Sequence, residues 1–275
     1  MFRNVLILFF LFVLVAKGES IKIERNYFFT GDLGKVLIKG YDEKERYSVI
    51  LKNRFGRWEF PVVDREAFFG IPLFVKGKNL SLYLKKNGEV IFSKRLKIFH
   101  KKYRVSKITV KERKITKSVL KRIKKENRLL RKTFKIYTKK LFKENRLHKP
   151  LKKLVVSTPF GAKRIINGKK RSIHWGTDFE GKKGEPIFSV LSGKVVIAKD
   201  MFFTGKTIVI NHGLGLYTLY AHLSKIDVKK GDFVKRGQII GKVGSTGRST
   251  APHLHFGVYI NDVKVDPMIL LKRGL

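Results

Sequence analysis

The 275-residue chain contains no cysteine. Disulfide bonds are therefore excluded, as is lipid attachment to a cysteine at a signal-peptide cleavage site. No thiolate is present to act as a nucleophile or to bind a metal, so any metal site must use histidine, aspartate or glutamate. The absence of cysteine does not indicate a cellular compartment, because an exported protein need not carry disulfides.

Acidic residues are also scarce, with 21 Asp and Glu against 62 Lys and Arg, which gives a formal net charge of +41. Apolar residues make up 43% of the chain, enough for ordinary hydrophobic cores. Such a positive surface favours polyanionic partners. We expect no nucleic acid among them, because no nucleic-acid-binding motif accompanies the charge.

No apolar run reaches the roughly 20 residues that a helix needs to cross a bilayer. The run Val5–Ala16 has 12 residues, follows the positive charge of Arg3, and ends at Ala16-Lys17-Gly18. This arrangement is typical of a cleaved signal peptide, which we predict over residues 1–18. We therefore expect export to the periplasm or cell envelope and no transmembrane segment in the mature chain. An uncleaved membrane anchor is the alternative.

Residues 19–100 carry short β-type runs separated by turn residues. Lys35–Lys39, Tyr47–Leu51 and Leu80–Leu84 are three of about seven predicted strands, and Lys86-Asn87-Gly88-Glu89 is a hairpin signal. The pattern predicts a β-sandwich-like module, a small antiparallel sandwich for which an immunoglobulin-like type is one candidate. Because no group of chemically reactive side chains occurs here, we expect a targeting, packing or gating role.

Residues 101–150 are predicted to form a basic helical connector. Its helix is expected from Thr116 to Arg146, with Thr116 or Ser118 as the N-terminal cap. One apolar face is formed at helical spacing by Val119, Ile123, Leu130, Phe134, Tyr137 and Leu141. The connector contains 21 Lys and Arg against three Glu. Two interpretations stay open, a solvated helix face and an arm that binds anionic envelope polymers.

Residues 151–275 are expected to form an antiparallel β-sheet domain, with Lys206–Ile210, Tyr217–Ala221, Gln238–Val243 and His253–Ile260 as strands. Four of the seven histidines lie here in three short motifs, which are Ser172 to Asp178, Leu219 to Ser224 and Ala251 to Phe256. Side chains alternate along a strand, so His253 and His255 project from the same face. A His-x-His pair alone is weak evidence, but three such motifs together indicate a zinc site. The fold class is therefore mainly β, with a sandwich-like module, a helical connector and this sheet domain.

These motifs resemble the catalytic domain of the lysostaphin/LytM-type zinc metallopeptidases, peptidoglycan endopeptidases with a duplicated hybrid motif fold. The resemblance extends over residues 155–270. It is carried by Phe160-Gly161, Arg164, Asn167-Gly168, Arg171-Ser172, His174 to Asp178, Gly184 to Pro186, Asn211 to Gly215, Tyr220 to Leu223, Gly231-Asp232, Gly237-Gln238, Gly244 to Thr250, His253 to His255 and Asp266-Pro267.

The resemblance implies that His174, Asp178 and His255 bind Zn²⁺, and that His222 and His253 are catalytic. Three protein ligands leave a fourth position for water, which is typical of a catalytic zinc site. The chain has no His-Glu-x-x-His motif that would supply a glutamate base, so the two histidines must handle the proton or the oxyanion. Which of them is the base stays open. No cofactor other than zinc is expected.

The expected function is hydrolysis of peptide cross-links in bacterial peptidoglycan by an exported zinc metalloendopeptidase, with the stem peptides as substrate. The alternative is a non-enzymatic scaffold of the same fold that binds or activates other wall hydrolases. Such scaffolds typically lack zinc ligands, whereas all five site positions are filled here. The sequence does not distinguish which cross-link bond would be cut.

The other histidines are interpreted as structural. We expect His212 to serve packing or turn formation, and His100 and His148 to be solvated. Trp175 is equally compatible with lining a substrate groove and with packing. The segment Gly244 to Arg248 lacks the full phosphate-binding loop pattern and is interpreted as a turn that leads to the strand of His253.

Overall fold

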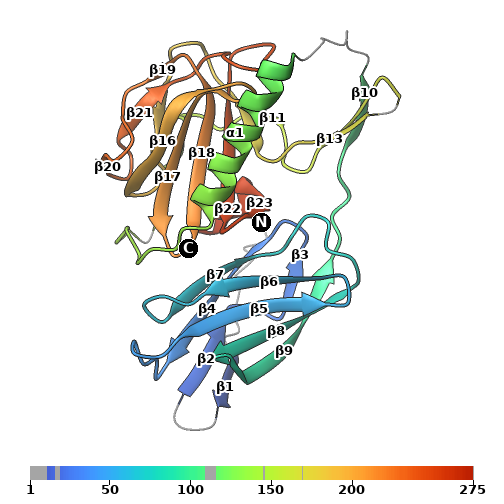
Figure 1. Ribbon diagram of the computed structural model, residues 1–275, viewed down its shortest axis with the longest axis vertical. Helices are drawn as coiled ribbons and strands as arrows, with labels where there is room; N and C mark the ends of the chain where they lie inside the picture. The colour runs from blue at the N-terminus through green and yellow to red at the C-terminus, as the bar shows by residue number, and fades with distance from the viewer. Residues whose placement is uncertain (1–10, 16–18, 109–115, 145, 169, 275) are drawn as a thin grey trace, which may run out of the picture. The chain divides into compact units, whose positions relative to one another are not determined.

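The computed structural model describes residues 11–15, 19–108, 116–144, 146–168 and 170–274 (Figure 1). These residues form mainly β-structure, as predicted, and two compact units, Met1–Lys101 and Lys102–Leu275. Within the described ranges, no helix is both long and apolar enough to span a membrane. Of the predicted signal peptide only Leu11–Val15 is described, as strand β1, and the rest lies outside these ranges.

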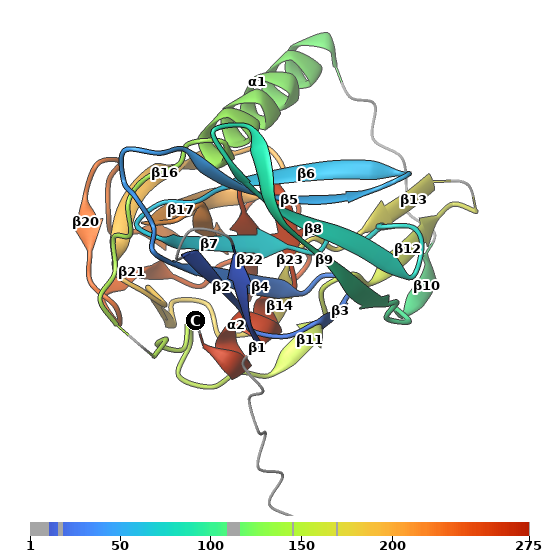
Figure 2. The ribbon, with the colours of Figure 1, turned by 90° about the horizontal axis from the view of Figure 1, so that it is seen from below.

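The first unit contains two sheets, whose strands can be followed in Figure 2. One has the order β1-β2-β4-β7 and the other the order β3-β9-β8-β5-β6. The strands are β2 (Glu19–Ile23), β3 (Tyr27–Phe29), β4 (Leu33–Lys39), β5 (Tyr47–Asn53), β6 (Gly56–Pro61), β7 (Glu66–Gly70), β8 (Asn79–Lys86) and β9 (Glu89–Phe99). The predicted sandwich-like module is confirmed.

Aromatic side chains join the two sheets of this unit. The ring of Phe28 on β3 lies 5.2 Å from that of Phe69 on β7, centroid to centroid, and Phe60 on β6 lies 6.5 Å from Phe69. The predicted hairpin is also present, because Lys86 pairs with Glu89 across a two-residue turn. Both turn residues have positive φ, 51° at Asn87 and 92° at Gly88, as a tight hairpin requires.

The second unit is built on an eight-stranded sheet. Its order is β11-β14-β22-β18-β17-β16-β20, with β23 also paired to β22. These strands are β11 (Val156–Thr158), β14 (Thr177–Glu180), β16 (Gly193–Met201), β17 (Gly205–Gly213), β18 (Leu216–Leu223), β20 (Phe233–Val234), β22 (His253–Ile260) and β23 (Val263–Val265). All pairings within it are antiparallel, and the strands predicted around residues 206–210, 217–221 and 253–260 are confirmed.

Two three-stranded sheets and a short helix complete the unit. The sheet β10-β12-β13 is formed by Val105–Ile108, Lys163–Ile166 and Lys170–Ile173. The sheet β15-β21-β19 is formed by Pro186–Phe188, Ile239–Lys242 and Lys225–Ile226, and its middle strand agrees with the prediction for residues 238–243. Helix α2 is Pro267–Arg273, capped by the Asp266 side chain.

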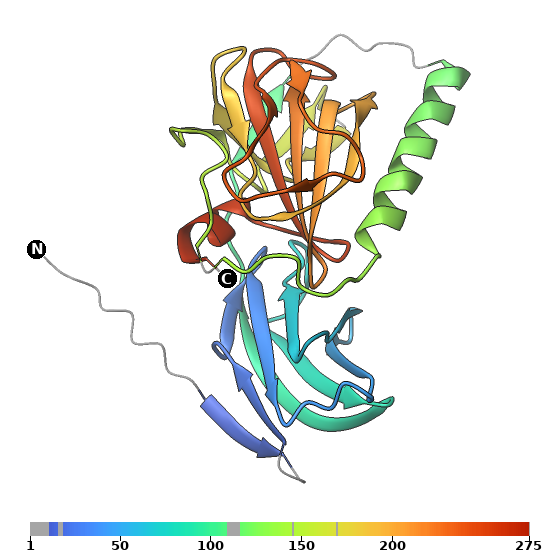
Figure 3. The same ribbon diagram turned by 90° about the vertical axis from the view of Figure 1, so that its left-hand side faces the viewer.

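Helix α1 (Lys117–Phe134) lies across the eight-stranded sheet (Figures 1 and 3). Its cap is Thr116, as predicted, since the Thr116 side chain accepts a hydrogen bond from the amide of Val119 at 3.3 Å. Phe134 at the other end is 4% exposed, stacks on Tyr259 at 4.0 Å and meets Tyr217 edge-on at 5.4 Å. This contact fixes the helix to β18 and β22.

The prediction that the helix continues to Arg146 is wrong. After Phe134 the chain forms a non-helical strap, residues 136–142, along the β17–β18 turn. In the strap, Leu141 donates its amide hydrogen bond to the carbonyl of His212 at 2.9 Å, and Leu214 donates to the carbonyl of Thr138 at 2.9 Å. These long-range bonds take the place of the helical ones, so the apolar spacing of Tyr137 and Leu141 is not used on a helix face.

Candidate metal centre

The candidate centre begins with the pairing of β14 and β22. In their antiparallel register Asp178 lies opposite His255, and Glu180 opposite His253. Along β22 the residues alternate, with Leu254 buried and its two histidine neighbours partly exposed, so His253 and His255 share a face of the sheet. Two of the three predicted motifs are therefore joined by strand register.

His174 completes a cluster with these two strands. Its Nε2 lies 2.9 Å from Oδ1 of Asp178 and 3.0 Å from Nδ1 of His255, and the latter is 2.8 Å from the same Oδ1. The three atoms thus form a nearly equilateral triangle. Among the residues that the structure describes, this is the one group of three or more His, Asp or Glu side chains arranged to hold a metal ion.

The hydrogen bonding of this triangle favours a cation at its centre. Nδ1 of His174 lies 3.0 Å from the carbonyl oxygen of Pro159 and must donate to it, which leaves a lone pair on Nε2 of the neutral ring. That lone pair faces the Asp178 carboxylate and the His255 ring. The arrangement is repulsive unless a proton or a metal ion lies between them.

Zinc fits this donor set. Two imidazole nitrogens and one carboxylate oxygen are common zinc ligands, and bonds of about 2.1 Å would separate them by roughly 3.4 Å in a tetrahedron. The observed separations are a few tenths of an ångström shorter. Gly176 leaves the space that His255 needs, because a Cβ there would lie 2.7 Å from two atoms of the imidazole ring.

The electrostatics agree with an ionised carboxylate in this cluster. Burial alone would raise the pKa of Asp178, but the hydrogen bonds and charges of His174 and His255 outweigh it and hold that pKa well below its usual range. For His255, burial is the main cause and lowers the pKa of the imidazole. When the two imidazoles give up their extra protons, the ionised carboxylate and the ring nitrogens can bind a divalent cation in place of those protons.

His222 reaches the same region from a bulge in β18. Lys206 pairs with Leu223 and Ile208 with Tyr220, so Ala221 and His222 together face a single residue of β17. The φ of His222 is 65°, a left-handed conformation that is uncommon for a residue with a side chain and is often found at functional sites. The bulge turns the imidazole towards β22.

The loop of Thr246 holds His222 in this orientation. Nδ1 of His222 lies 2.8 Å from the carbonyl oxygen of Thr246, so the proton of the neutral ring is on Nδ1 and Nε2 keeps its lone pair. The Thr246 hydroxyl donates to the carbonyl of Leu223 at 2.8 Å and accepts from the amide of Lys206 at 2.9 Å. The predicted turn at residues 244–248 therefore also positions a histidine, which its sequence pattern did not reveal.

His253 is arranged in the same way. Its Nδ1 lies 2.8 Å from the carbonyl oxygen of Ala251, and its Nε2 is 3.7 Å from Oδ1 of Asp178. The His222 ring centroid is 4.9 Å from that of His253 and 5.9 Å from that of His255. Burial lowers the pKa of His222 to about 4, which keeps this ring neutral near pH 7. The structure thus brings all five predicted site residues together.

The remaining candidates have structural environments. His212 is fully buried between the carbonyl of Ser192 at 2.9 Å and the hydroxyl of Thr218 at 2.8 Å, in agreement with its interpretation as a packing residue. His100 is exposed, as expected, whereas His148 is half-buried and packs on Phe188. Trp175 is also half-buried and packs on Phe160, with Nζ of Lys264 4.4 Å from its ring centroid.

Comparisons with known proteins agree with this geometry. The family model of peptidase family M23 matches residues 172–267, which include all five histidine and aspartate positions. Peptidoglycan DD-endopeptidase ShyB of Vibrio cholerae is 47% identical over 95 residues, covering 34% of this chain and 22% of ShyB. Lysostaphin of Staphylococcus staphylolyticus is 46% identical over 115 residues, 40% of this chain and 23% of lysostaphin. The chain thus spans about a quarter of the length of these curated relatives.

A solved structure is similar over nearly the whole chain. It is the crystal structure of a protein assigned to peptidase M23 in Pseudomonas aeruginosa, with 30% sequence identity and a TM-score of 0.67. The match covers 88% of this chain and 94% of that one. The resemblance seen in the motifs is confirmed, and the chain belongs to peptidase family M23.

Proposed function

We propose that this protein is an exported zinc metalloendopeptidase that hydrolyses peptide cross-links in bacterial peptidoglycan. The single observation that carries the proposal is the convergence of His174, Asp178 and His255 within 3.0 Å of one another, with two further histidines beside them. The names of ShyB and lysostaphin support a wall substrate.

In this proposal His174 and His255 bind Zn²⁺ through one ring nitrogen each, and Asp178 binds through one carboxylate oxygen. Zinc, when bound, supplies a Lewis acid that polarises a peptide carbonyl and lowers the pKa of water. The protein contributes the fixed orientation of the ligands, through the Pro159 carbonyl behind His174 and the strand register that places Asp178 opposite His255.

His222 and His253 supply the acid–base chemistry. Each has its Nδ1 proton held by a backbone carbonyl, so Nε2 is the nitrogen left to exchange a proton with water or substrate. An imidazole that has taken up the proton of the attacking water can donate a hydrogen bond to the developing oxyanion, or pass the proton to the leaving amine. Two histidines with the same preset tautomer can divide these roles between them.

For the chain as a whole we propose a signal peptide over 1–18, the sandwich-like module over 19–100, the basic connector over 101–150 and the catalytic domain over 151–275. A non-catalytic scaffold of the same fold is not favoured, because a complete set of ligands and proton-handling histidines would have no purpose in it.

The test is digestion of purified sacculi of known cross-link chemistry, with the fragments identified by mass spectrometry. We expect cross-linked peptide fragments to decrease and new free amino groups to appear on the stem peptides, while glycan strands stay intact. Asp178→Ala, measured in parallel, should release no fragments and should bind much less zinc by elemental analysis. As a matched control, Asp262→Asn changes an exposed aspartate outside the cluster and should behave as wild type. Near-stoichiometric zinc in Asp178→Ala would refute the ligand assignment.

A further inference from the structure

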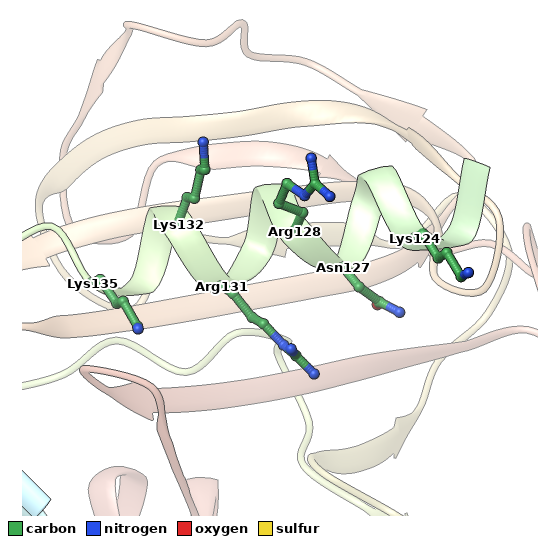
Figure 4. A pocket seen from close by; sticks show the side chains of 6 residues that line it. All are labelled: Lys124, Asn127, Arg128, Arg131, Lys132 and Lys135. Atoms are coloured by element: carbon green, nitrogen blue, oxygen red, sulfur yellow. The ribbon is translucent and has the colours of Figure 1, made fainter. Parts of the chain in front are cut away.

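Helix α1 carries a row of exposed cations on the side that does not pack on the sheet. Six of its side chains line a hollow of about 380 Å³, and five of the six are positively charged. They are Lys124, Asn127, Arg128, Arg131, Lys132 and Lys135, and we call them the α1 basic surface (Figure 4). From Lys124 to Lys135, the cap residue that follows α1, the surface spans 12 residues, and the 11 rises of 1.5 Å between them make it about 16 Å long.

Glu126, the acidic residue of α1, does not neutralise this surface. Glu126 is 7% exposed and lies on the sheet side, where it accepts hydrogen bonds from Arg122 at 2.7 Å and from the amide of Phe202 at 2.9 Å. Arg122 also pairs with Asp200 at 2.9 Å. The acidic groups near the helix are therefore used to hold α1 on the catalytic domain, and the outer cations repel one another.

The α1 basic surface also leads towards the metal centre. Burial lowers the pKa of Lys264, and the nearby positive charge of Arg131 lowers it further, while the negative charge of Asp262 acts in the opposite direction. Nζ of Lys264 lies over the ring of Trp175, whose chain neighbour is His174. Two positive charges, those of Arg131 and Lys264, thus lie between the helix and the chain neighbour of a proposed zinc ligand, with the negative charge of Asp262 beside them.

We propose that the α1 basic surface binds a linear polymer that carries phosphate groups, and that this contact holds the peptidase on its substrate. The second part of this proposal, that the contact holds the peptidase on its substrate, rests on the proposed function. Arg, Lys and Asn are the side chains that usually contact phosphate oxygens, and the planar guanidinium groups of Arg128 and Arg131 can each form two parallel hydrogen bonds to one phosphate. A rigid, straight helix suits a polymer whose charges repeat along its length better than a single compact anion.

The experiment measures binding of the full chain to fluorescently labelled inorganic polyphosphate by anisotropy, over a series of salt concentrations. The variant Arg128→Gln/Arg131→Gln/Lys132→Gln removes three cations and keeps good helix formers. We expect roughly a tenfold or greater loss of affinity at low salt. We also expect the slope of log K against log salt to become shallower by about 2, because three fewer counterions are displaced.

The matched control, Lys183→Gln/Lys229→Gln/Lys230→Gln, removes three exposed lysines away from α1. Its affinity for polyphosphate should decrease less than about threefold. An equal loss in both variants would overturn the proposal, since it would indicate a response to net charge alone. Tighter binding of wild type to polyglutamate or to anionic phospholipid vesicles than to polyphosphate would also overturn it. Because affinity is measured without catalysis, a protein that binds polyphosphate but cleaves no sacculi would refute the proposed function, and with it the holding of a peptidase on its substrate, but would leave the binding of the phosphate polymer standing.

Discussion

Backbone carbonyls set the chemistry of three histidines at the proposed site. Those of Pro159, Thr246 and Ala251 lie 2.8 to 3.0 Å from Nδ1 of His174, His222 and His253. Each contact fixes one tautomer, so the Nε2 atoms are available as a metal ligand or as proton acceptors before any substrate binds. Sequence motifs identified the histidines, but these carbonyls could not be predicted, because a carbonyl has no residue-type signature.

A comparison of alanine variants should show that His222 and Asp178 have different roles. His222→Ala should retain zinc close to the wild-type ratio, because His222 is outside the ligand triangle. It should lose about 10²-fold or more in turnover of a soluble cross-linked peptide, as is usual when a positioned proton-transfer group is removed. Zinc content by elemental analysis and turnover by chromatography test this. Turnover near the wild-type rate would rule out a catalytic role for His222.

A substitution at Thr246 tests how far the orientation of His222 matters for turnover. Thr246→Ala keeps the carbonyl that binds His222 but removes the hydroxyl contacts to Leu223 and Lys206. We expect turnover to decrease by about tenfold while zinc is retained, because a loosened loop orients His222 less well. Thr246→Ser, which keeps the hydroxyl, should recover most of the loss. If the serine variant is as slow as the alanine variant, the loop does not act through these hydrogen bonds.

Because His212 is buried, we predict that the stability of the fold depends on pH. Burial lowers its folded-state pKa to about 4, against an unfolded value of about 6.5. The unfolded chain therefore binds more protons between these values, so stability is fully present above pH 6.5 and decreases as the pH falls towards 4. Between pH 7.5 and pH 5, His212 should account for a loss of about 2 kcal/mol.

Urea unfolding of wild type and His212→Gln at both pH values measures this contribution. The variant should lose about 2 kcal/mol less on acidification than wild type, whatever its stability at pH 7.5. His100→Gln changes an exposed histidine and should follow wild type. Equal acid sensitivity of His212→Gln and wild type would contradict a neutral, buried His212.

The elements that carry the site differ in how well their sequences revealed them. The strands that carry His222 and His255 have local signals, namely β-type runs bounded by glycine or turn residues, and both were predicted. The short strand of Asp178, β14 (Thr177–Glu180), was not among the predicted strands. The bulge at His222 and the end of α1 at Phe134 depend on long-range hydrogen bonds. Apolar periodicity continued through Tyr137 and Leu141, so the local pattern could not show that these residues belong to the strap instead.

Phe134 tests how firmly α1 is fixed to the sheet. Phe134→Ala removes a ring that is 4% exposed and stacked on Tyr259, so we expect a loss of roughly 3–5 kcal/mol in the free energy of unfolding. Leu120→Ala, on the same helix but 44% exposed, should change it by less than about 0.5 kcal/mol. Urea unfolding followed by circular dichroism measures both. A loss below about 1 kcal/mol for Phe134→Ala would indicate that α1 detaches readily in solution.

At the scale of the whole molecule, the boundary of the compact unit decides which fragment can fold. The core beneath α1 contains Tyr217, Val209 and Tyr259, and the strap adds backbone hydrogen bonds to the β17–β18 turn. A fragment that starts at residue 151 matches the family motifs but lacks both features. Its exposed aromatic surface should make it less stable and more prone to aggregate than a fragment that starts at Lys102.

We therefore expect residues 102–275 to unfold cooperatively, to retain zinc and to cleave a soluble cross-linked peptide at close to the full-length rate. Residues 151–275 should melt at least about 10 °C lower, because losing the Phe134 contact alone costs several kcal/mol and each kcal/mol lowers the melting temperature by a few degrees in a domain of this size. Scanning calorimetry and size-exclusion chromatography of the two fragments give the comparison. Equal melting temperatures would show that α1 and the strap contribute no stability, and that residues 101–150 are only a tether between the sandwich-like module and the peptidase.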